Sequence, residues 1–203
     1  MAWTLEVPEL ELSEQVAVVP ERTALLIADM QNDFVDPQGT LFVAAARQTI
    51  AACRRLLSFA REQGMLVVYT QDTHRPGSPE WALWGEHVQE GSWGWEIIPE
   101  LAPQEGDLLI RKPRYDAFYA TELDHQLRLR GVDTLIICGT VANICVQYTA
   151  AGAGHRWYKI IHPVDAISGF SAAEKAAALG HIHRLFQATL TKAENITAIT
   201  SDD

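Results

Sequence analysis

Three residues with reactive side chains follow apolar runs in this chain. Asp29 and Lys112 each come directly after such a run. Cys145 follows the run Thr134–Cys138 after a short turn. Because open α/β sheets bind ligands at the carboxyl ends of their strands, we expect the three side chains to meet at one sheet edge. A lysine between a thiol and a carboxylate would lower the thiol pKa and keep the carboxylate ionised. The pattern therefore predicts a nucleophilic thiol with a carboxylate as its general base.

Each of these residues also has a structural interpretation. Cys145 could pack as a small hydrophobe, Asp29 could hydrogen-bond a neighbouring loop, and Lys112 could point to solvent. The stretch after Cys145 is helix-like, and a thiol at a helix N-terminus feels the positive end of the helix dipole, which favours thiolate. The shared position at one sheet edge, rather than any single residue, supports the catalytic interpretation.

A second group of polar residues follows the next apolar run. Asp72 and His74 form an Asp-x-His pair, and His87 lies further along the same segment. One carboxylate and two imidazoles can fill three positions of an open metal site. Loop histidines are common, so this pattern alone is a weak signal.

Strand-like and helix-like segments alternate along the chain and would position these groups. Apolar runs of five or six residues, with turn residues between them, predict parallel strands, and apolar spacings of three and four predict helices. This alternation predicts a parallel sheet of about six strands with helices on both faces. The predicted strands are Thr23–Ala28, Met65–Tyr69, Asp107–Arg111, Thr134–Cys138, Tyr158–His162 and Ala188–Leu190, and the predicted helices are Ala44–Gln63, Thr121–Arg130, the stretch after Cys145, and a helix capped by Ser171 that ends at Phe186.

Composition limits the classes of function. The chain has 203 residues, of which 48% are hydrophobic and 21% charged, as is typical of a globular protein. We expect one domain over residues 1–203, with residues 1–20 as an N-terminal extension. A net charge of −10 is unsuited to the phosphate backbone of nucleic acid, and no apolar run reaches the roughly 18 residues of a membrane span. Neither nucleic acid nor a membrane is therefore an expected partner.

The N-terminal segment and the cysteines indicate the compartment. Met1 to Glu21 is acidic and has neither the basic region nor the apolar core of a signal peptide. The three cysteines form no CxxC pair, which argues against a disulfide scaffold. We therefore expect a cytoplasmic location.

Three ordered motifs resemble the isochorismatase-like superfamily of cysteine hydrolases, which includes nicotinamidase and N-carbamoylsarcosine amidohydrolase. They are Leu25–Phe34, Lys112–Phe118 and Gly139–Val146, and the resemblance extends from about Thr23 to Leu190. It implies a three-layer α/β/α sandwich with a doubly wound, mostly parallel sheet. It also implies homo-oligomers, either dimers or tetramers.

The resemblance implies a role for each catalytic candidate. Asp29 would be the general base, Lys112 the bridging cation and Cys145 the nucleophile. A cis peptide bond is implied at Thr140–Val141, where the backbone N–H groups of Val141 and Cys145 would form the oxyanion hole. Members that cleave isochorismate lack the cysteine, so its presence here favours attack on an amide carbonyl.

The resemblance to nicotinamidase implies one divalent metal ion, zinc in the first place, and no organic cofactor. Asp72, His74 and His87 would be its ligands. The chain departs from the nicotinamidase pattern after His74 and at Val88, so a different metal site, or a metal-free site whose histidines bind substrate directly, stays open. Phe34 and Trp84 would wall a flat substrate, although aromatic residues in a long loop also form satellite cores.

The implied function is hydrolysis of a C–N amide bond in a small molecule, with nicotinamide as the first compound to test. The alternatives are a carbamoyl or ureido amidohydrolase and an isochorismatase-type hydrolase acting on another substrate. A non-catalytic protein on a retained hydrolase scaffold is the alternative from another class. The intact set of Asp29, Lys112 and Cys145 argues against it.

Overall fold

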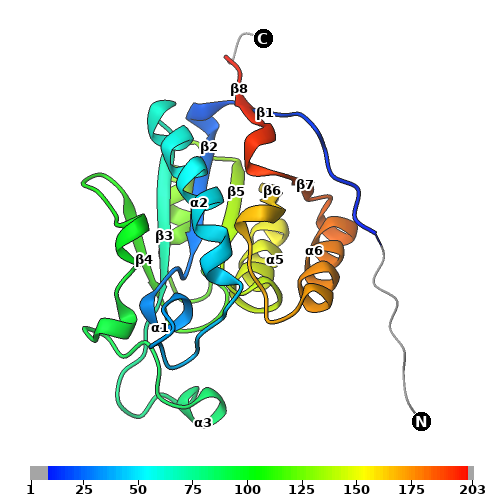
Figure 1. The fold of residues 1–203 in the computed structure, drawn as a ribbon. Coiled ribbons are helices and arrows are strands. Elements are labelled where there is room, and N and C mark those ends of the chain that lie inside the picture. Colours follow the sequence, from blue (N-terminus) through cyan, green and yellow to red (C-terminus); the bar gives the residue numbers. More distant parts are fainter. Residues whose placement is uncertain (1–8, 201–203) are drawn as a thin grey trace.

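A six-stranded parallel sheet forms the centre of the computed structural model, in which residues 9–200 are described. Its strand order is β4-β3-β2-β5-β6-β7, and every neighbouring pair is parallel (Figure 1). This arrangement confirms the predicted doubly wound sheet. The strands are β2 (Thr23–Ala28), β3 (Leu66–Asp72), β4 (Leu108–Lys112), β5 (Thr134–Gly139), β6 (Lys159–Pro163) and β7 (Thr189–Thr191).

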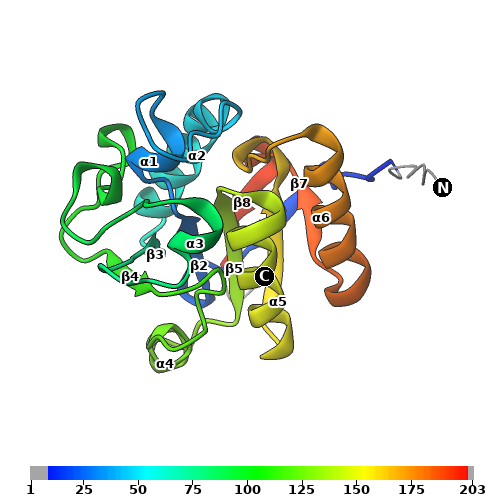
Figure 2. The ribbon, with the colours of Figure 1, turned by 90° about the horizontal axis from the view of Figure 1, so that it is seen from below.

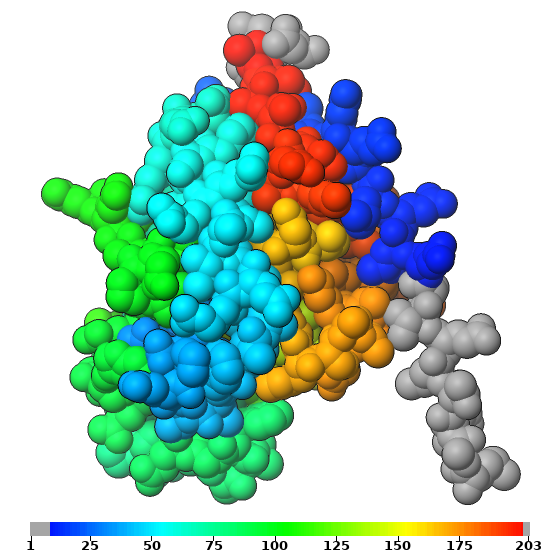
Figure 3. Space-filling view, in the orientation of Figure 1, coloured from blue at the N-terminus to red at the C-terminus, as the bar shows by residue number. Residues whose placement is uncertain are grey.

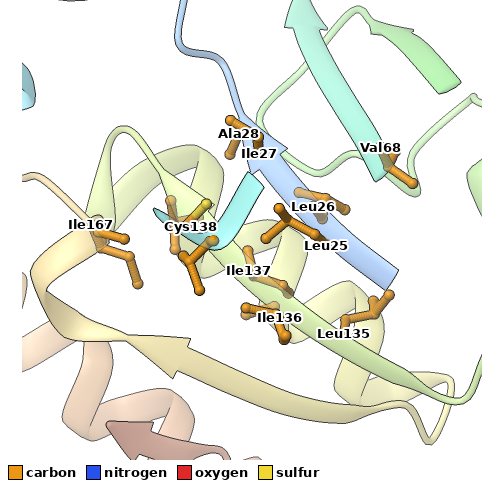
Figure 4. Close-up of a cluster of buried hydrophobic side chains, with 14 of the residues drawn as sticks. Leu25, Leu26, Ile27, Ala28, Val68, Leu135, Ile136, Ile137, Cys138 and Ile167 are labelled. Carbon is orange, nitrogen blue, oxygen red and sulfur yellow. The ribbon is translucent and has the colours of Figure 1, made fainter. Parts of the chain in front are cut away.

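The two central strands are apolar along their whole length because both of their faces are covered. Every residue of β2 is buried, as are the last five residues of β5. Figure 4 shows Leu25–Ala28 beside Leu135–Cys138, with Val68 and Ile167 packed against them. Burial on both faces explains why these runs are continuous rather than alternating.

Helices cover both faces of the sheet and complete the predicted three layers. α2 packs on one face through the apolar stripe that contains Cys53, Leu56 and Ala60, and it fills the front of the molecule in Figure 3. α4 and α5 lie on the opposite face, and α6 packs beside α5 (Figure 2). The helices are α1 (Asn32–Val35), α2 (Ala46–Glu62), α3 (Trp81–Trp84), α4 (Leu123–Leu129), α5 (Gln147–His155) and α6 (Ala172–Phe186).

The helix ends follow the predicted signals. Gly64 and Gly131 adopt positive φ values of 67° and 68° directly after α2 and α4, a conformation in which glycine carries no Cβ penalty. Ser171 caps α6 by accepting a hydrogen bond from the Glu174 backbone N–H at 3.1 Å. The predicted helices are one or two residues longer at each end than the observed α2 and α4, the usual uncertainty at frayed ends.

A second, two-stranded parallel sheet pairs the two ends of the described chain. β1 (Val16–Val18) pairs with β8 (Ile196–Ala198), and both lie at the top of Figure 1. No strand was predicted in either segment, and β1 falls within the expected N-terminal extension, whose residues 1–8 lie outside the described chain. None of the helices in residues 9–200 combines the length and apolar character that a membrane span requires.

Candidate active site

The three catalytic candidates converge at the carboxyl edge of the sheet, at the lower end of Figure 1. The Lys112 Nζ atom lies 2.8 Å from Asp29 Oδ2 and 3.4 Å from Cys145 Sγ. Lys112 is also 3.2 Å from Asp72 Oδ1, because Asp72 and Lys112 are register partners at the ends of β3 and β4. The parallel topology thus brings together groups that are far apart in sequence.

The two carboxylate oxygens of Asp29 contact different residues, Thr70 and Lys112. Its Oδ1 atom accepts a hydrogen bond from Thr70 Oγ1 at 2.6 Å, and Oδ2 faces Lys112. The Asp29 backbone, with φ of 47°, donates to the Thr70 carbonyl at 3.2 Å. Sequence reasoning missed Thr70, although its place opposite Ala28 in the strand register is the signal that could have found it.

Burial and charge set the protonation of the site. Burial would lower the pKa of Lys112, but Asp29 and Asp72 raise it well above its ordinary value, so the amine is an ammonium. Burial raises the pKa of the Cys145 thiol well above its ordinary value; Lys112 opposes this rise, while the carboxylates of Asp29 and Asp72 add to it. Burial and the two carboxylates thus favour the thiol form of the resting sulfur over the predicted thiolate.

Cys145 lies in one turn of π-helix, Ala142–Val146, that precedes α5. The predicted position at the start of an ordinary helix is corrected accordingly, and such π turns are frequent at functional sites. The Thr140–Val141 peptide bond is cis, as the resemblance implies. Within residues 9–200, no group accepts a hydrogen bond from the Val141 backbone N–H, so this donor is available beside the thiol.

A small pocket of about 40 Å³ opens onto the Cys145 thiol. Phe34 and Trp84, the two substrate-binding candidates, both line it, and Trp84 Nε1 donates to Tyr115 Oη at 3.0 Å across its wall. The described lining residues include no lysine or arginine, and most are apolar. They are Phe34, Leu41, Val43, Asp72, Glu80, Trp84, His87, Tyr115, Val141, Ile144, Cys145 and Phe170.

Four buried side chains gather beside this pocket and could hold a metal ion. Asp72, His74 and His87 are joined by Glu80, and one donor atom from each lies within 4.8 Å of all the others. Each of the four is no more than 3% exposed. Glu80 was not predicted, because it lies in an irregular loop where no spacing signals its position. Its carboxylate also pairs with Arg114 Nη1 at 2.7 Å.

The donor set fits a divalent cation. His87 Nδ1 hydrogen-bonds the Gly85 carbonyl at 2.8 Å, which leaves the Nε2 lone pair free for a ligand role. His74 Nδ1 lies 3.2 Å from Ser78 Oγ, and its buried Nε2 has no hydrogen-bond partner in the described chain. Burial would raise the pKa of Asp72, but Lys112 and His74 lower it to about 2, so its carboxylate is ionised. Two imidazoles and two carboxylates are ligands that zinc accepts.

Comparison with known families and sequences shows consistent similarity. The isochorismatase domain model matches residues 23–194. The ureidoacrylate amidohydrolase RutB of Stutzerimonas stutzeri is 34% identical over 192 residues, which cover 81% of this chain and 77% of that protein. The enzyme of the same name from Variovorax paradoxus is 34% identical over 193 residues, covering 81% and 76%.

Two solved structures are also similar to this chain in fold and sequence. N-carbamoylsarcosine amidase from Thermoplasma acidophilum has a TM-score of 0.79 and 36% identity, covering 85% of this chain and 97% of that one. The pyrazinamidase/nicotinamidase of Streptococcus mutans has a TM-score of 0.79 and 30% identity, covering 83% and 99%.

Proposed function

This chain is an amidohydrolase of the isochorismatase family, and we propose that it hydrolyses a small-molecule amide through Cys145. The observation that carries the proposal is the buried ammonium of Lys112, 2.8 Å from the Asp29 carboxylate and 3.4 Å from the thiol. A thiol, a base and a fixed cation at the mouth of a pocket are the parts that acyl transfer requires.

The proposed reaction begins with the thiol protonated. Asp29 takes the thiol proton as the Cys145 sulfur attacks the amide carbonyl. The Lys112 ammonium stabilises negative charge on the Asp29 carboxylate before this transfer and on the sulfur during it. The backbone N–H groups of Val141 and Cys145 would hold the oxyanion, and one such donor contributes about 3 kcal/mol in known cases. Asp29 then passes the proton to the leaving amine. Asp29 takes a proton from water as that water attacks the thioester carbonyl. The carbon–sulfur bond breaks, the carboxylic acid is released, and Asp29 returns the proton to the Cys145 sulfur.

We propose that Asp72, His74 and His87, with Glu80 as a fourth donor, hold one divalent metal ion, zinc in the first place. When bound, the ion would supply a Lewis acid beside the pocket that can hold a lone pair of the substrate. A metal-free site whose histidines bind the substrate directly is the alternative. Elemental analysis of protein purified without a histidine tag distinguishes them, since less than about a tenth of an equivalent counts against the metal site.

An uncharged amide is the preferred substrate class. The pocket walls are largely apolar, and the described lining includes no lysine or arginine to pair with a substrate carboxylate. A carbamoyl or ureido acid is the second candidate, because the similar proteins include ureidoacrylate amidohydrolase and N-carbamoylsarcosine amidase. That the protein forms homo-oligomers and that it is cytoplasmic are both still predictions from the sequence.

Ammonia release from a substrate panel tests the proposal. The panel contains nicotinamide, pyrazinamide, N-carbamoyl amino acids and ureido acids, each tested with the wild-type enzyme and with Cys145→Ala. We expect the highest kcat/KM on an uncharged amide and no turnover by Cys145→Ala. Preference for a ureido acid would select the second candidate, and amide turnover by Cys145→Ala would refute the nucleophile.

A further inference from the structure

Gln31 and Asp33 lie two and four residues after Asp29, the proposed general base, and their side chains hydrogen-bond the backbone of the segments that carry Asp72 and His87. We propose that Gln31 and Asp33 are positioning residues that hold the ligands Asp72 and His87 in place. The inference rests on the metal site proposed above and assigns new roles within it.

Gln31 fixes the backbone of Asp72 by a reciprocal pair of hydrogen bonds. Its Nε2 donates to the Asp72 carbonyl at 2.9 Å, and its Oε1 accepts from the Asp72 backbone N–H at 2.9 Å. Nε2 also donates to the Trp95 carbonyl at 2.8 Å, and the side chain is fully buried. The Gln31 amide therefore bonds the Asp72 backbone as a neighbouring strand would, at the end of β3. There the Asp72 carboxylate lies between Lys112 and His74.

Asp33 fixes the turn that follows His87. Its Oδ2 accepts from the Val88 backbone N–H at 2.7 Å, and its Oδ1 accepts from the Thr40 backbone N–H at 3.1 Å. Val88 has a φ of 36°, a left-handed conformation that is strained for a β-branched residue. The hydrogen bond that the Asp33 carboxylate accepts from the Val88 backbone N–H offsets this strain and keeps His87 turned toward the cluster.

The same turn also reaches the other histidine. The His74 backbone N–H donates to the Val88 carbonyl at 3.1 Å, so Val88 connects Asp33 to His74 as well as to His87. Gly94 leaves the space that this arrangement needs, because a Cβ there would lie 2.3 Å from the Asp33 carboxylate. Residues 29–33, which run from the end of β2 into α1, thus carry the proposed general base and two supports of the proposed metal ligands.

Zinc affinity of the full chain, measured by competition with a chelator, tests this assignment. Gln31→Leu removes the reciprocal pair, and Asp33→Asn replaces one acceptor oxygen with a donor. We expect each variant to bind zinc about 10- to 100-fold more weakly, the usual effect of losing a partner that orients a ligand. Asn32→Ser is the matched control, because Asn32 lies between Gln31 and Asp33 and its side chain donates to the Trp93 carbonyl at 2.8 Å rather than to a segment that carries a ligand.

The control separates positioning from general loss of stability. Thermal unfolding of the metal-free proteins shows how far each variant destabilises the fold, and Asn32→Ser should lower the midpoint while leaving zinc affinity within about twofold. If Gln31→Leu does not fold, Asp33→Asn decides the outcome. Unchanged zinc affinity in the folded variants, or an equal loss in Asn32→Ser, would overturn the inference. Failure of the wild type to bind zinc would remove the metal site and this inference with it, while the ammonia assay still reports on hydrolysis.

Discussion

At the scale of single residues, the protonation of Cys145 is the main departure from what the sequence predicted. Motif and spacing identify Cys145, Asp29 and Lys112, and the structure brings them together. The thiol pKa could not be judged in the same way, because it depends on the burial of the sulfur and on a second carboxylate, Asp72. In the proposed reaction, deprotonation of the thiol therefore accompanies its attack on the substrate, which makes the orientation of Asp29 decisive.

Thr70 hydrogen-bonds Asp29, the proposed base, so we expect its removal to slow chemistry more than binding. Thr70→Val keeps the β-branched shape but loses the 2.6 Å hydrogen bond to Asp29 Oδ1. We expect kcat to fall about tenfold with KM nearly unchanged, while Thr70→Ser, which keeps the hydroxyl, restores most of the rate. Steady-state kinetics on the best panel substrate measure this. Equal kcat values for the valine variant and the wild type would show that Thr70 does not orient the base.

At the scale of secondary structure, hydrophobic patterns predicted the six strands of the main sheet within a few residues. Continuous apolar runs identify strands buried on both faces, and the structure confirms them. Patterns missed β1 and β8, whose three residues each are too short to show a period. They also missed the contribution of Glu80, since loop conformation rather than periodicity brings it to the cluster.

The junction of β2 and β5 places the loop that carries Cys145, and Gly139 should be essential to it. Gly139 has a φ of 110°, and a Cβ would lie 2.1 Å from the Ala28 carbonyl oxygen. Gly139→Ala should lower the free energy of unfolding by on the order of 3 kcal/mol, since backbone must move. Gly64→Ala is the control: φ is 67° and no atom lies within 4 Å, so about 1 kcal/mol is expected. Urea unfolding checks both, and equal losses would contradict the steric argument.

At the scale of the whole molecule, a buried histidine should make stability depend on pH. His162 is fully buried, with Nδ1 at 3.1 Å from the Ile137 carbonyl and Nε2 without a hydrogen-bond partner among the described residues. Burial lowers the pKa of His162 from 6.5 to about 4. The unfolded chain therefore binds this proton more readily, and the contribution to stability is complete above pH 6.5 and is lost as the pH falls toward 4.

Urea unfolding of the wild type and His162→Asn between pH 7 and pH 4 measures this contribution. Asparagine keeps a donor near the position of Nδ1 but does not titrate. We expect the wild type to lose about 3 kcal/mol more than the variant over this range. Parallel pH profiles for the two proteins would show that His162 is not buried in the neutral form.

The most direct test of the account is mass spectrometry of the enzyme quenched with acid during turnover of its best amide substrate. We predict an adduct on the peptide that contains Cys145, with the mass of the substrate acyl group, and a stronger signal when hydrolysis is slowed. Continued turnover with Cys145 unmodified at every quench time, together with full activity of Cys145→Ala, would contradict the thioester mechanism.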